Sequence, residues 1–437
     1  MNQLLKIGQE LQVENNIPCR TKAFIGGGGQ GEVYQAELNG KPVALKWYFP
    51  DQATSAQRSL LENLIQKGAP NDRFLWPTSL VRNTDGKGLG YLMPLREKRY
   101  KSIIDLMKGR IEPSFRALAT AGLELAHSFL LLHSKGLCYR DISFGNVFFD
   151  PQTGNVLICD NDNVGIEGQS GIGVLGTPRF MAPEIVRGEA VPGTQTDLYS
   201  LAVLLFYMLM VHHPLEGEKE TKIKCFDLPA MNKLYGTEPL FIFDPNEQSN
   251  RPVPGIHDNA LIYWQIYPQF IRDTFTTAFT DGIRDPMKRV RESQWRSIMS
   301  QLRDSIIFCG NCGEHNFYDA ELLQDKGRLN PCWNCKKMLP IPPRIRIGKS
   351  VVMLNHDTQL FPHHTENRNE YDFSAPVAEV SRHPKDPNIW GLKNLSKDKW
   401  VAAFPDGSFK DIEPGKNISL AQGIKIQFGQ SEGEIRL

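Results

Sequence analysis

The pattern of apolar and polar residues divides the chain into regions of different character. Up to about residue 100, short runs rich in β-branched and aromatic residues recur, among them "EVYQAEL" and "PVALKWY", and the step Asn39-Gly40 separates these two runs. Asn-Gly between two such runs is a strong signal for a β-hairpin. We therefore expect a small β-sheet lobe in this part of the chain.

Two longer apolar stretches predict helices after this lobe. The stretch "SFRALATAGLELAHSFLLLH" at residues 114–133 has helical periodicity, and "LYSLAVLLFYMLMV" at residues 198–211 is a second, more apolar stretch. The second is shorter than the ~20 residues that span a bilayer, so we interpret it as a buried core helix. A sheet lobe followed by a larger helical lobe predicts an α+β fold.

The carboxyl-terminal part changes character twice. Residues 306–340 contain paired cysteines and end in "LPIPP", which is typical of a linker. From residue 344 to the end, short alternating runs recur between turns such as "PDG", "EPG" and "AQG". This pattern favours a small β-sandwich or barrel.

Length and charge restrict the class of protein. At roughly 150 residues per domain, 437 residues predict two to three domains. Lys plus Arg (50) nearly balances Asp plus Glu (49), so no global charge attracts nucleic acid or a membrane surface. The start "MNQLLKIGQE" does not resemble a signal peptide. We expect a cytoplasmic protein whose thiols stay reduced.

Four of the eight cysteines occur in pairs with metal-ligand spacing. They are Cys309 and Cys312, then Cys332 and Cys335 after 19 intervening residues. In a reducing compartment this pattern predicts a four-thiolate zinc site on two tight turns, which resembles a zinc ribbon. Four thiols packed as small apolar groups are the alternative. Few cations lie nearby, so we expect a structural role and not nucleic-acid binding.

Two segments near the amino terminus are suited to phosphate. The run "IGGGGQGEVY" places Gly26, Gly28 and Gly31 between strand-like runs, where backbone amides can approach phosphates; a flexible hairpin tip is the alternative. Lys46 lies in the otherwise apolar run "VALK" and needs an anionic partner there. We expect Glu62, in the helix-like "QRSLLENLIQKG", to be the carboxylate that pairs with it.

Three further polar residues complete the predicted constellation. "CYRDISFGNVFF" places Asp141 and Asn146 five apart in a loop, and "ICDNDNVG" places Asp160 at the end of an apolar strand. Such spacing lets one group accept a hydroxyl proton while others hold a metal on the same phosphate.

The order of these motifs resembles the protein kinase family. Later segments agree: "GTPRFMAPE" is similar to the family's substrate-docking segment, "DLYSL" to the start of its central helix, and "RDPMKRV" supplies Arg289 as the usual ion-pair partner of Glu184. The resemblance implies a bilobal kinase domain over residues 1–305, with lobes 1–93 and 94–305.

The resemblance also implies roles for individual residues. Asp141 is the catalytic base, Asn146 and Asp160 hold Mg²⁺, and Lys46, positioned by Glu62, holds the phosphates of ATP. Residues expected around the nucleotide are Gly26, Gly28, Gly31, Val33, Ala44, Lys46, Met93, Pro94, Leu95 and Phe148.

Two hydroxyl residues are expected to matter for specificity and regulation. Thr177 matches the position that marks serine/threonine specificity. Ser170 is either a regulatory phosphosite or an ordinary loop serine.

The chain departs from the family pattern at two places. Ser143 and Gly145 stand where the family's serine/threonine and tyrosine kinases respectively carry a cation near the transferred phosphate. Asn161 and Asp162 replace the Phe and Gly that usually follow the metal-binding Asp. We predict slow turnover or an unusual acceptor from the first departure, and a loop that flips less readily from the second.

The last hundred residues, 344–437, resemble a forkhead-associated domain through "IRIGKS", "VSRH" and "LAQGIKIQFG". Lys349, Ser381 and Arg382 are able to meet a phosphate there; a sandwich that has lost this site is the alternative. The order of kinase, zinc ribbon and forkhead-like sandwich is similar to bacterial signalling kinases that accompany a PP2C-type phosphatase and a von Willebrand-type protein.

Three functions follow from these resemblances. The first is an autophosphorylating serine/threonine kinase that uses ATP and Mg²⁺. The second is a nucleotide-binding pseudokinase scaffold that acts through its carboxyl-terminal domains. The third is a kinase-fold enzyme for small molecules, which "GTPRFMAPE" disfavours.

Overall fold

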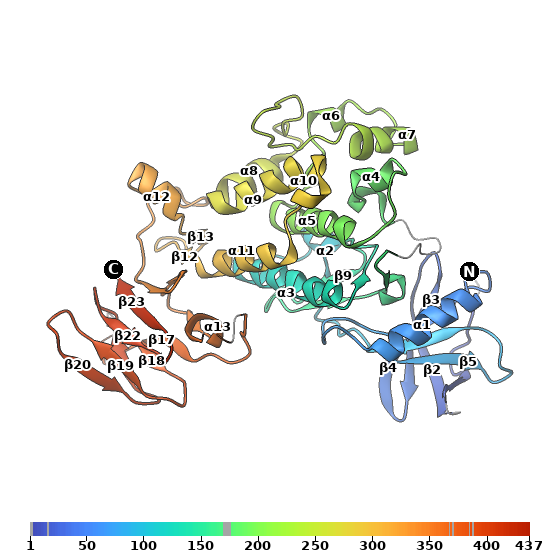
Figure 1. The fold of residues 1–437 in the computed structure, drawn as a ribbon, viewed down its shortest axis with the longest axis horizontal. Helices are drawn as coiled ribbons and strands as arrows, with labels where there is room; N and C mark the ends of the chain where they lie inside the picture. Colours follow the sequence, from blue (N-terminus) through green and yellow to red (C-terminus); the bar gives the residue numbers. More distant parts are fainter. Residues whose placement is uncertain are drawn as a thin grey trace. The chain divides into compact units, whose positions relative to one another are not determined.

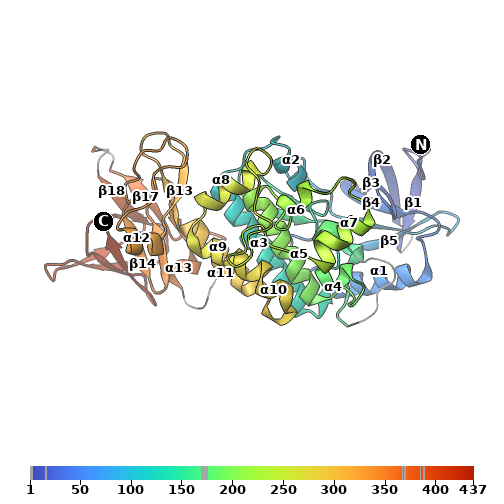
Figure 2. The same cartoon turned by 90° about the horizontal axis from the view of Figure 1, so that it is seen from above.

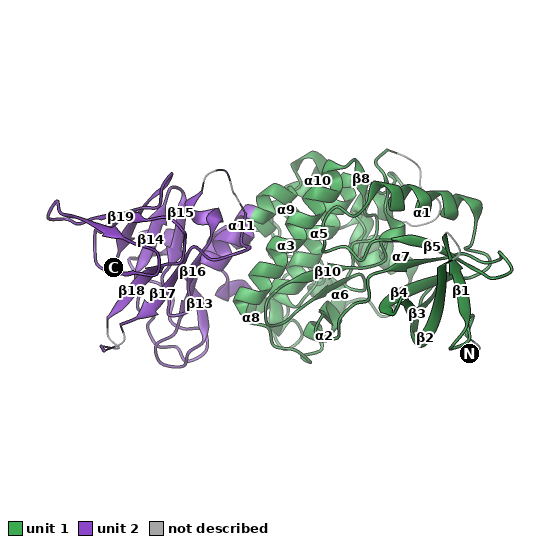
Figure 3. Cartoon of the chain, turned by 90° about the horizontal axis from the view of Figure 1, so that it is seen from below, with its two compact units in different colours: residues 1–263, 273–296 green, residues 264–272, 297–437 purple. Residues whose placement is uncertain are grey.

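The chain forms two compact units. The computed structural model describes residues 3–14, 17–168, 176–366, 368, 371–383, 385–386 and 389–437. Unit 1 contains residues 1–263 and 273–296, and unit 2 contains residues 264–272 and 297–437 (Figure 3). We expected a boundary after residue 305, whereas the division falls after Arg296 and assigns residues 264–272 to unit 2.

Unit 1 begins with a closed six-stranded barrel in the strand order β1-β2-β3-β4-β6-β5. Its strands are β1 (Glu10–Val13), β2 (Ile17–Gly27), β3 (Gly31–Leu38), β4 (Lys41–Tyr48), β5 (Ser79–Asn83) and β6 (Gly90–Met93). The predicted hairpin connects β3 and β4, and both Asn39 (φ 51°) and Gly40 (φ 75°) adopt the left-handed conformation that a two-residue hairpin turn requires. Antiparallel pairing of β1 with β5 closes the barrel.

One helix covers part of this barrel. Helix α1 (Ser55–Lys67) begins at Thr54, whose side chain accepts the amide of Gln57, and ends at Gly68. It buries Leu61 and Leu64, while most of its other residues face solvent. The helix is therefore held by a narrow apolar stripe.

The helical part of unit 1 is built around α5 (Thr194–Met210). Its residues from Thr196 to Met210 are buried, as the apolar run predicts. Helix α3 (Phe115–Ser134) lies beside it (Figures 1 and 2). Among the described residues, α3 is long and apolar enough to span a membrane, but 61% of its most apolar window is buried inside the protein, as in the core helix of a soluble protein.

Shorter elements complete this part of the chain. The helices are α2 (Ile103–Met107), α4 (Pro183–Val186), α6 (Glu218–Thr221), α7 (Leu228–Asn232), α8 (Asp258–Ile266), α9 (Gln269–Phe279), α10 (Asp281–Arg284) and α11 (Glu292–Asp304). The strands are β7 (Lys101–Ser102), β8 (Leu137–Cys138), β9 (Val147–Phe149), β10 (Val156–Ile158) and β11 (Gly165–Ile166). The boundaries between the two units fall within α8, α9 and α11, so each of these helices has residues in both units.

A buried charge cluster fixes the loop that follows β8. Asp197, near the start of α5, accepts the backbone amides of Tyr139 and Arg140. The same carboxylate contacts Nε2 of His133 at 3.1 Å, and the other ring nitrogen of His133 contacts Glu292. All three side chains are less than a tenth exposed. Burial lowers the pKa of His133, but its hydrogen bonds to the two carboxylates outweigh burial and raise the pKa to about 9.

Unit 2 contains two antiparallel sheets with one shared core. One sheet has the order β15-β14-β23-β22-β19-β20, and the other has the order β16-β17-β18-β21. Their elements are β14 (Arg344–Ile347), β15 (Ser350–Met353), β16 (Gln359–Leu360), α13 (Pro362–Thr365), β17 (Ala378–Arg382), β18 (Trp390–Asn394), β19 (Trp400–Ala403), β20 (Phe409–Ile412), β21 (Asn417–Ser419), β22 (Lys425–Gln427) and β23 (Glu432–Arg436). Every strand of both sheets contributes to one apolar cluster, so the predicted β-sandwich is present.

The cysteine-containing segment of unit 2 is not an isolated module. It contains β12 (Ile306–Phe308), β13 (His315–Phe317) and α12 (Ala320–Lys326). Ile307 and Leu329 share a core with Met353 of the sandwich, and Leu339 and Ile341 of "LPIPP" pack against that core. The prediction that "LPIPP" is a linker is therefore wrong: a segment of this size buries too little apolar surface alone, and the sandwich completes its core.

The charge cluster generates a prediction about pH and stability. Because the pKa of His133 is raised in the folded protein, its contribution to stability is complete below the unfolded pKa of about 6.5 and is lost as pH rises through about 9. Replacing it in His133→Gln should reduce the free energy of unfolding by an amount that shrinks by up to about 3 kcal/mol between neutral pH and pH ~9.5. Urea unfolding of both proteins across this range measures the difference; a difference independent of pH contradicts the prediction.

Candidate functional site

One cavity of unit 1 brings together most of the residues predicted to bind a nucleotide. It has a volume of about 470 Å³ and lies under the β2–β3 hairpin. Its walls include the predicted residues Gly26, Gly28, Gly31, Val33, Ala44, Lys46, Met93, Pro94, Leu95, Asp141, Phe148 and Asp160. Leu75, Arg96 and Cys159 also line it and were not predicted. Residues far apart in sequence thus meet around one space of the size of a small-molecule site.

The glycine-rich segment forms the tip of the β2–β3 hairpin, as the strand-like flanks predict. The amide of Gly28 donates to the carbonyl of Gly31 at 2.9 Å and closes the turn. A Cβ on Gly31 would lie 2.2 Å from the carbonyl oxygen of Trp47 in the neighbouring strand. Glycine at this position therefore lets β3 and β4 approach each other at the mouth of the cavity.

Asp141 is held by two neighbouring side chains. Nδ2 of Asn146 donates to one carboxylate oxygen of Asp141 at 2.9 Å, and the hydroxyl of Thr177 donates to the other at 2.8 Å. Burial raises the pKa of Asp141, and these two hydrogen bonds partly oppose the rise. The carboxylate is fixed in orientation and belongs to the cavity wall, as a group that must meet a hydroxyl requires.

Asp160 directs a carboxylate into the same cavity. It follows β10 with a left-handed backbone (φ 47°), and its side chain is 40% exposed. Partial burial raises its pKa, the Lys46 ammonium 3.6 Å away opposes that rise, and the nearby Asp162 carboxylate adds to it. Asp141 and Asp160 both line this cavity, and carboxylate oxygens are the ligands that hard divalent cations prefer, so the cavity is a favourable place for a cation.

The predicted ion pair between Lys46 and Glu62 is wrong. Glu62 lies on the outer face of α1, is about half exposed, and pairs with Arg58 at 2.9 Å. Nζ of Lys46 instead lies 2.8 Å and 2.9 Å from the two carboxylate oxygens of Asp162. The reason is local geometry: a 3₁₀ turn at residues 161–163 brings Asp162 beneath β4, where the lysine side chain ends.

Sequence reasoning missed the partners of Asp162. Besides Lys46, the carboxylate accepts the hydroxyl of Tyr91 at 3.0 Å and the hydroxyl of Tyr48. Tyr48 stands two residues after Lys46 on the same face of β4, which "LKWY" reveals, but Tyr91 faces Lys46 only through the register of β4 and β6. Burial raises the pKa of Asp162, and Lys46 with the two tyrosine hydroxyls outweighs it and lowers the pKa.

Asn161 occupies a fully buried position. Its Nδ2 donates to the carbonyl of Ile158 at 2.9 Å. Its Oδ1 is buried and has no hydrogen-bond partner among the described residues. One of the two polar atoms of the Asn161 side chain is thus hydrogen-bonded, and the turn at 161–163 retains an unpaired acceptor.

Two expectations outside the cavity have different outcomes. Arg289 pairs with Glu184 at 2.8 Å, as the family resemblance implies. Ser170 lies outside the described residues.

The four paired cysteines of unit 2 lie together. Their sulfur atoms are all within 4.8 Å of one another, with Cys309 and Cys335 3.5 Å apart and Cys312 and Cys332 3.6 Å apart. With Zn–S bonds of about 2.3 Å, a tetrahedron has S–S edges of about 3.8 Å. The cluster therefore has the size and donor set of a four-thiolate metal site.

The two cysteine turns have the same backbone geometry. In the first, the amide of Gly313 donates to the carbonyl of Cys309; in the second, the amide of Lys336 donates to the carbonyl of Cys332, both at 2.9 Å. Gly313 (φ 77°) and Lys336 (φ 61°) both adopt the left-handed conformation. Two matched turns that direct four thiols to one point fit a bound ion better than apolar packing.

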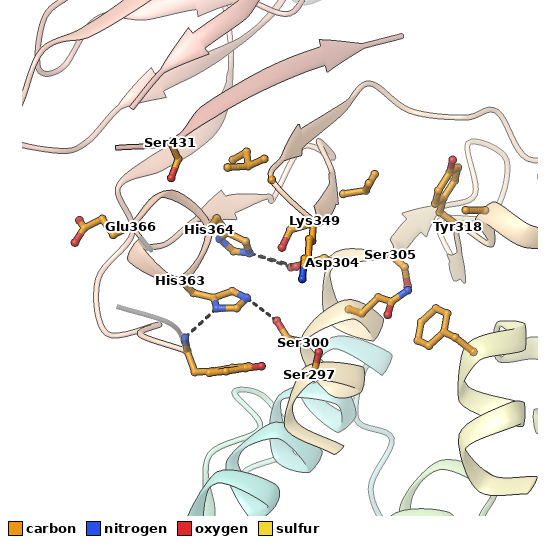
Figure 4. A pocket seen from close by; sticks show the side chains of 18 of the residues that line it. Ser297, Ser300, Asp304, Ser305, Tyr318, Lys349, His363, His364, Glu366 and Ser431 are labelled. Carbon is orange, nitrogen blue, oxygen red and sulfur yellow. Dashed lines mark hydrogen bonds and ion pairs between the residues drawn. The ribbon is translucent and has the colours of Figure 1, made fainter. Parts of the chain in front are cut away.

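A second cluster in unit 2 has ligand types but unsuitable hydrogen bonding. Asp304, His363 and His364 have potential ligand atoms within 4.8 Å of one another on the wall of a cavity of about 830 Å³ (Figure 4). Nδ1 of His364 accepts the backbone amide of Phe361 at 2.9 Å, so the neutral ring carries its proton on Nε2. Nε2 then donates to Asp304 at 3.2 Å.

The same tautomer applies to His363. Its Nδ1 accepts the backbone amide of Tyr371 and its Nε2 donates to Ser300, both at 2.9 Å (Figure 4). A metal needs a lone pair on Nε2, and these backbone amides keep a proton there. We therefore interpret the cluster as hydrogen-bonded packing around α11 and α13.

The residues expected to meet a phosphate in the sandwich have other contacts. Lys349 lines the 830 Å³ cavity. Ser381 donates to Asn417 at 3.1 Å, and the guanidinium of Arg382 lies 4.4 Å from the ring centroid of Trp390. These contacts identify no phosphate site.

Comparison with known proteins agrees with the geometry of the cavity. The family model for the protein kinase domain matches residues 19–254, more than half of the 437 residues. The match covers the glycine-rich hairpin, Lys46, Asp141, Asn146 and Asp160.

Curated relatives match the same part of the chain. Mouse protein kinase C delta type is 36% identical over 230 residues, which is 48% of this chain and 32% of that protein. The DNA damage-responsive serine/threonine-protein kinase RqkA of Deinococcus radiodurans is 29% identical over 212 residues, 46% of this chain and 31% of that protein. Serine/threonine-protein kinase pkn2 of Myxococcus xanthus is 29% identical over 208 residues, 44% of this chain and 24% of that protein.

The chain spans about a third or less of the length of these relatives, and their shared region is the kinase domain. With a family match over more than half of its length and the family's motifs gathered around one cavity, this chain belongs to the protein kinase domain family.

Proposed function

We propose that the protein is a serine/threonine protein kinase that uses ATP and Mg²⁺ and phosphorylates itself. The observation that carries the proposal is the convergence of Lys46, Asp141 and Asp160 on one cavity beneath a glycine-rich hairpin. Such an arrangement can hold phosphates, a cation and a hydroxyl at once.

Each polar residue has a role in this proposal. Asp141 orients the acceptor hydroxyl and accepts its proton, and the hydrogen bonds from Asn146 and Thr177 hold its carboxylate. Lys46 and the amides of the glycine-rich hairpin hold the phosphates. Asn146 and Asp160 would hold Mg²⁺, which neutralises charge on the phosphates when bound. Thr177 favours serine or threonine as the acceptor.

One departure from the family pattern supports a second function. Ser143 and Gly145 leave the loop after Asp141 without a cation, and Ser143 is buried. A nucleotide-binding pseudokinase scaffold that acts through the carboxyl-terminal unit would tolerate that loss. The charged groups that this chain retains on the cavity, Lys46, Asp141 and Asp160, favour the enzyme.

The biological setting remains part of the proposal. We propose a cytoplasmic bacterial signalling kinase with protein substrates, no membrane partner and no nucleic-acid partner. The unit 2 sandwich would be a forkhead-associated-like domain, and a PP2C-type phosphatase and a von Willebrand-type protein would be partners by family resemblance. Ser170 would be a regulatory phosphosite, which phosphopeptide mapping of the active protein can test.

The kinase activity is testable with two isosteric substitutions. Intact mass should increase by whole phosphates after incubation of the wild type with Mg-ATP. Asp141→Asn removes the proton acceptor and Asp160→Asn removes a carboxylate that faces the cation, so both should gain none. Asp72→Asn, whose side chain is 85% exposed and lies outside the cavity, should behave as the wild type. Nucleotide binding without phosphate gain on the protein or on any offered acceptor would favour the scaffold.

The cysteine cluster gives a separate prediction. We propose that Cys309, Cys312, Cys332 and Cys335 hold one structural Zn²⁺, because their spacing matches a tetrahedral thiolate site.

Elemental analysis of the purified full chain should find about one zinc per chain. Cys312→Ser should lose that zinc and lower the melting temperature, because metal binding stabilises a segment with little core of its own. Cys225→Ser is the matched control, since Cys225 is also exposed but lies outside the cluster. Equal zinc content in the wild type and Cys312→Ser would exclude this site.

A further inference from the structure

We propose that Asp162 positions Lys46 for the nucleotide phosphates, and that no carboxylate on α1 takes part. The inference rests on the proposed kinase function, because it concerns the lysine of that site. It assigns a positioning role to the second acid of "DND", where the family pattern has glycine.

The contacts of Lys46 identify its partner. Nζ lies 2.8 Å and 2.9 Å from the two oxygens of Asp162, and 3.6 Å from the nearer oxygen of Asp160. The Asp162 side chain is fully buried, whereas the Asp160 side chain is 40% exposed toward the cavity. The two acids therefore have different roles: Asp162 fixes the Lys46 side chain, and the Asp160 carboxylate remains available to a cation.

Asp162 is itself fixed by the barrel. The hydroxyls of Tyr48 and Tyr91 donate to its carboxylate, one from β4 and one from β6. With Lys46, three donors from two adjacent strands converge on one carboxylate. A buried acid with three donors has little freedom to move, so the direction of the Lys46 side chain is set by the barrel and the 161–163 turn.

Helix α1 contributes to this cluster only indirectly. Among the described residues, α1 forms a hydrogen bond with this cluster through Gln57, whose Nε2 donates to the hydroxyl of Tyr48 at 3.0 Å. Glu62 points away and pairs with Arg58. A shift of α1 therefore need not break the ion pair of Lys46, and the lysine is held without help from a helix carboxylate.

Lys46 keeps a donor for a ligand in this arrangement. An ammonium group has three N–H donors, and the two oxygens of Asp162 engage at most two of them. The side-chain oxygen of Gln30, at the tip of the glycine-rich hairpin, lies 3.2 Å from Nζ. Gln30 lines the cavity, so a phosphate oxygen can replace this neutral acceptor while the Asp162 pair persists.

Nucleotide affinity tests the inference independently of phosphate transfer. A fluorescent ATP analogue is titrated with Mg²⁺ into the full chain and into Lys46→Met, Asp162→Asn and Glu62→Gln. We expect Lys46→Met and Asp162→Asn each to weaken binding at least about tenfold, because each disrupts a charge-assisted contact, and Glu62→Gln to stay within about twofold of the wild type.

A double variant separates positioning from a purely structural role. If Asp162 acts through Lys46, adding Asp162→Asn to Lys46→Met should not weaken binding further. Glu32→Gln is the matched control for burial. Glu32 is a buried carboxylate of the same barrel, and it accepts hydrogen bonds from the hydroxyl of Tyr34 and the backbone amide of Leu4. It should lower the melting temperature and leave nucleotide affinity within about twofold.

Several results would overturn the inference. If folded Asp162→Asn binds the analogue as well as or better than the wild type, Asp162 does not assist Lys46. If Glu62→Gln loses as much nucleotide affinity as Lys46→Met, Glu62 of α1 takes part in positioning Lys46. If Asp162→Asn fails to fold, Tyr91→Phe decides, since it removes one donor to Asp162: unchanged affinity contradicts the inference and weaker affinity supports it. Failure of the wild type to bind nucleotide would instead refute the proposed function.

Discussion

A buried ammonium ion constrains the structure of unit 1. Lys46 is 5% exposed in an otherwise apolar strand, and an unpaired charge there would cost several kcal/mol. The carboxylate that compensates it, Asp162, is also buried and needs donors of its own, which Tyr48 and Tyr91 provide. The register of β4 with β6 and the turn at 161–163 are the features that bring these groups together. The polar wall of the cavity is built on that arrangement.

A second buried charge cluster fixes the loop that carries Asp141. Asp197 accepts two consecutive amides of the loop that leads to Asp141, while His133 links Asp197 to Glu292. Both clusters consist of one cation with carboxylates in the interior, and both hold a loop that carries an acid of the cavity. The proposed phosphate-binding and proton-accepting groups are therefore positioned by electrostatics on a packed scaffold, and the loops themselves need little regular structure.

In unit 2, a small segment buries enough apolar surface because it shares a core with the sandwich. The segment with four cysteines has two short strands and one short helix, and it shares Ile307 and Leu329 with a core that includes Met353. The sandwich has its own core with contributions from every strand. The shared apolar core stabilises the cysteine-containing segment, and an ion held by its four thiols would stabilise it further.

The sequence by itself determined several of the main elements and most of the residues that line the candidate site. The Asn39-Gly40 step between two strand-like runs indicated the β3–β4 hairpin, and the apolar patterns indicated the buried helix α5 and the sandwich. The order of motifs indicated the family together with Asp141, Asn146 and Asp160. The spacing of the cysteines indicated their cluster. These features are local, or depend on fixed intervals along the chain, so residue type and spacing are sufficient to find them.

Only the tertiary structure decided which groups pair. Spacing favoured Glu62 as the partner of Lys46, but the side chain that a buried lysine meets depends on strand register and on the path of a turn more than a hundred residues away. Long-range contacts also bring Tyr91 to Asp162 and give "LPIPP" a shared apolar core. The tertiary structure also sets the histidine tautomers by which His363 and His364 form hydrogen bonds and leave no Nε2 lone pair for a metal beside Asp304. Long-range contacts carry no short-range signature, because the chain that separates them can take many paths.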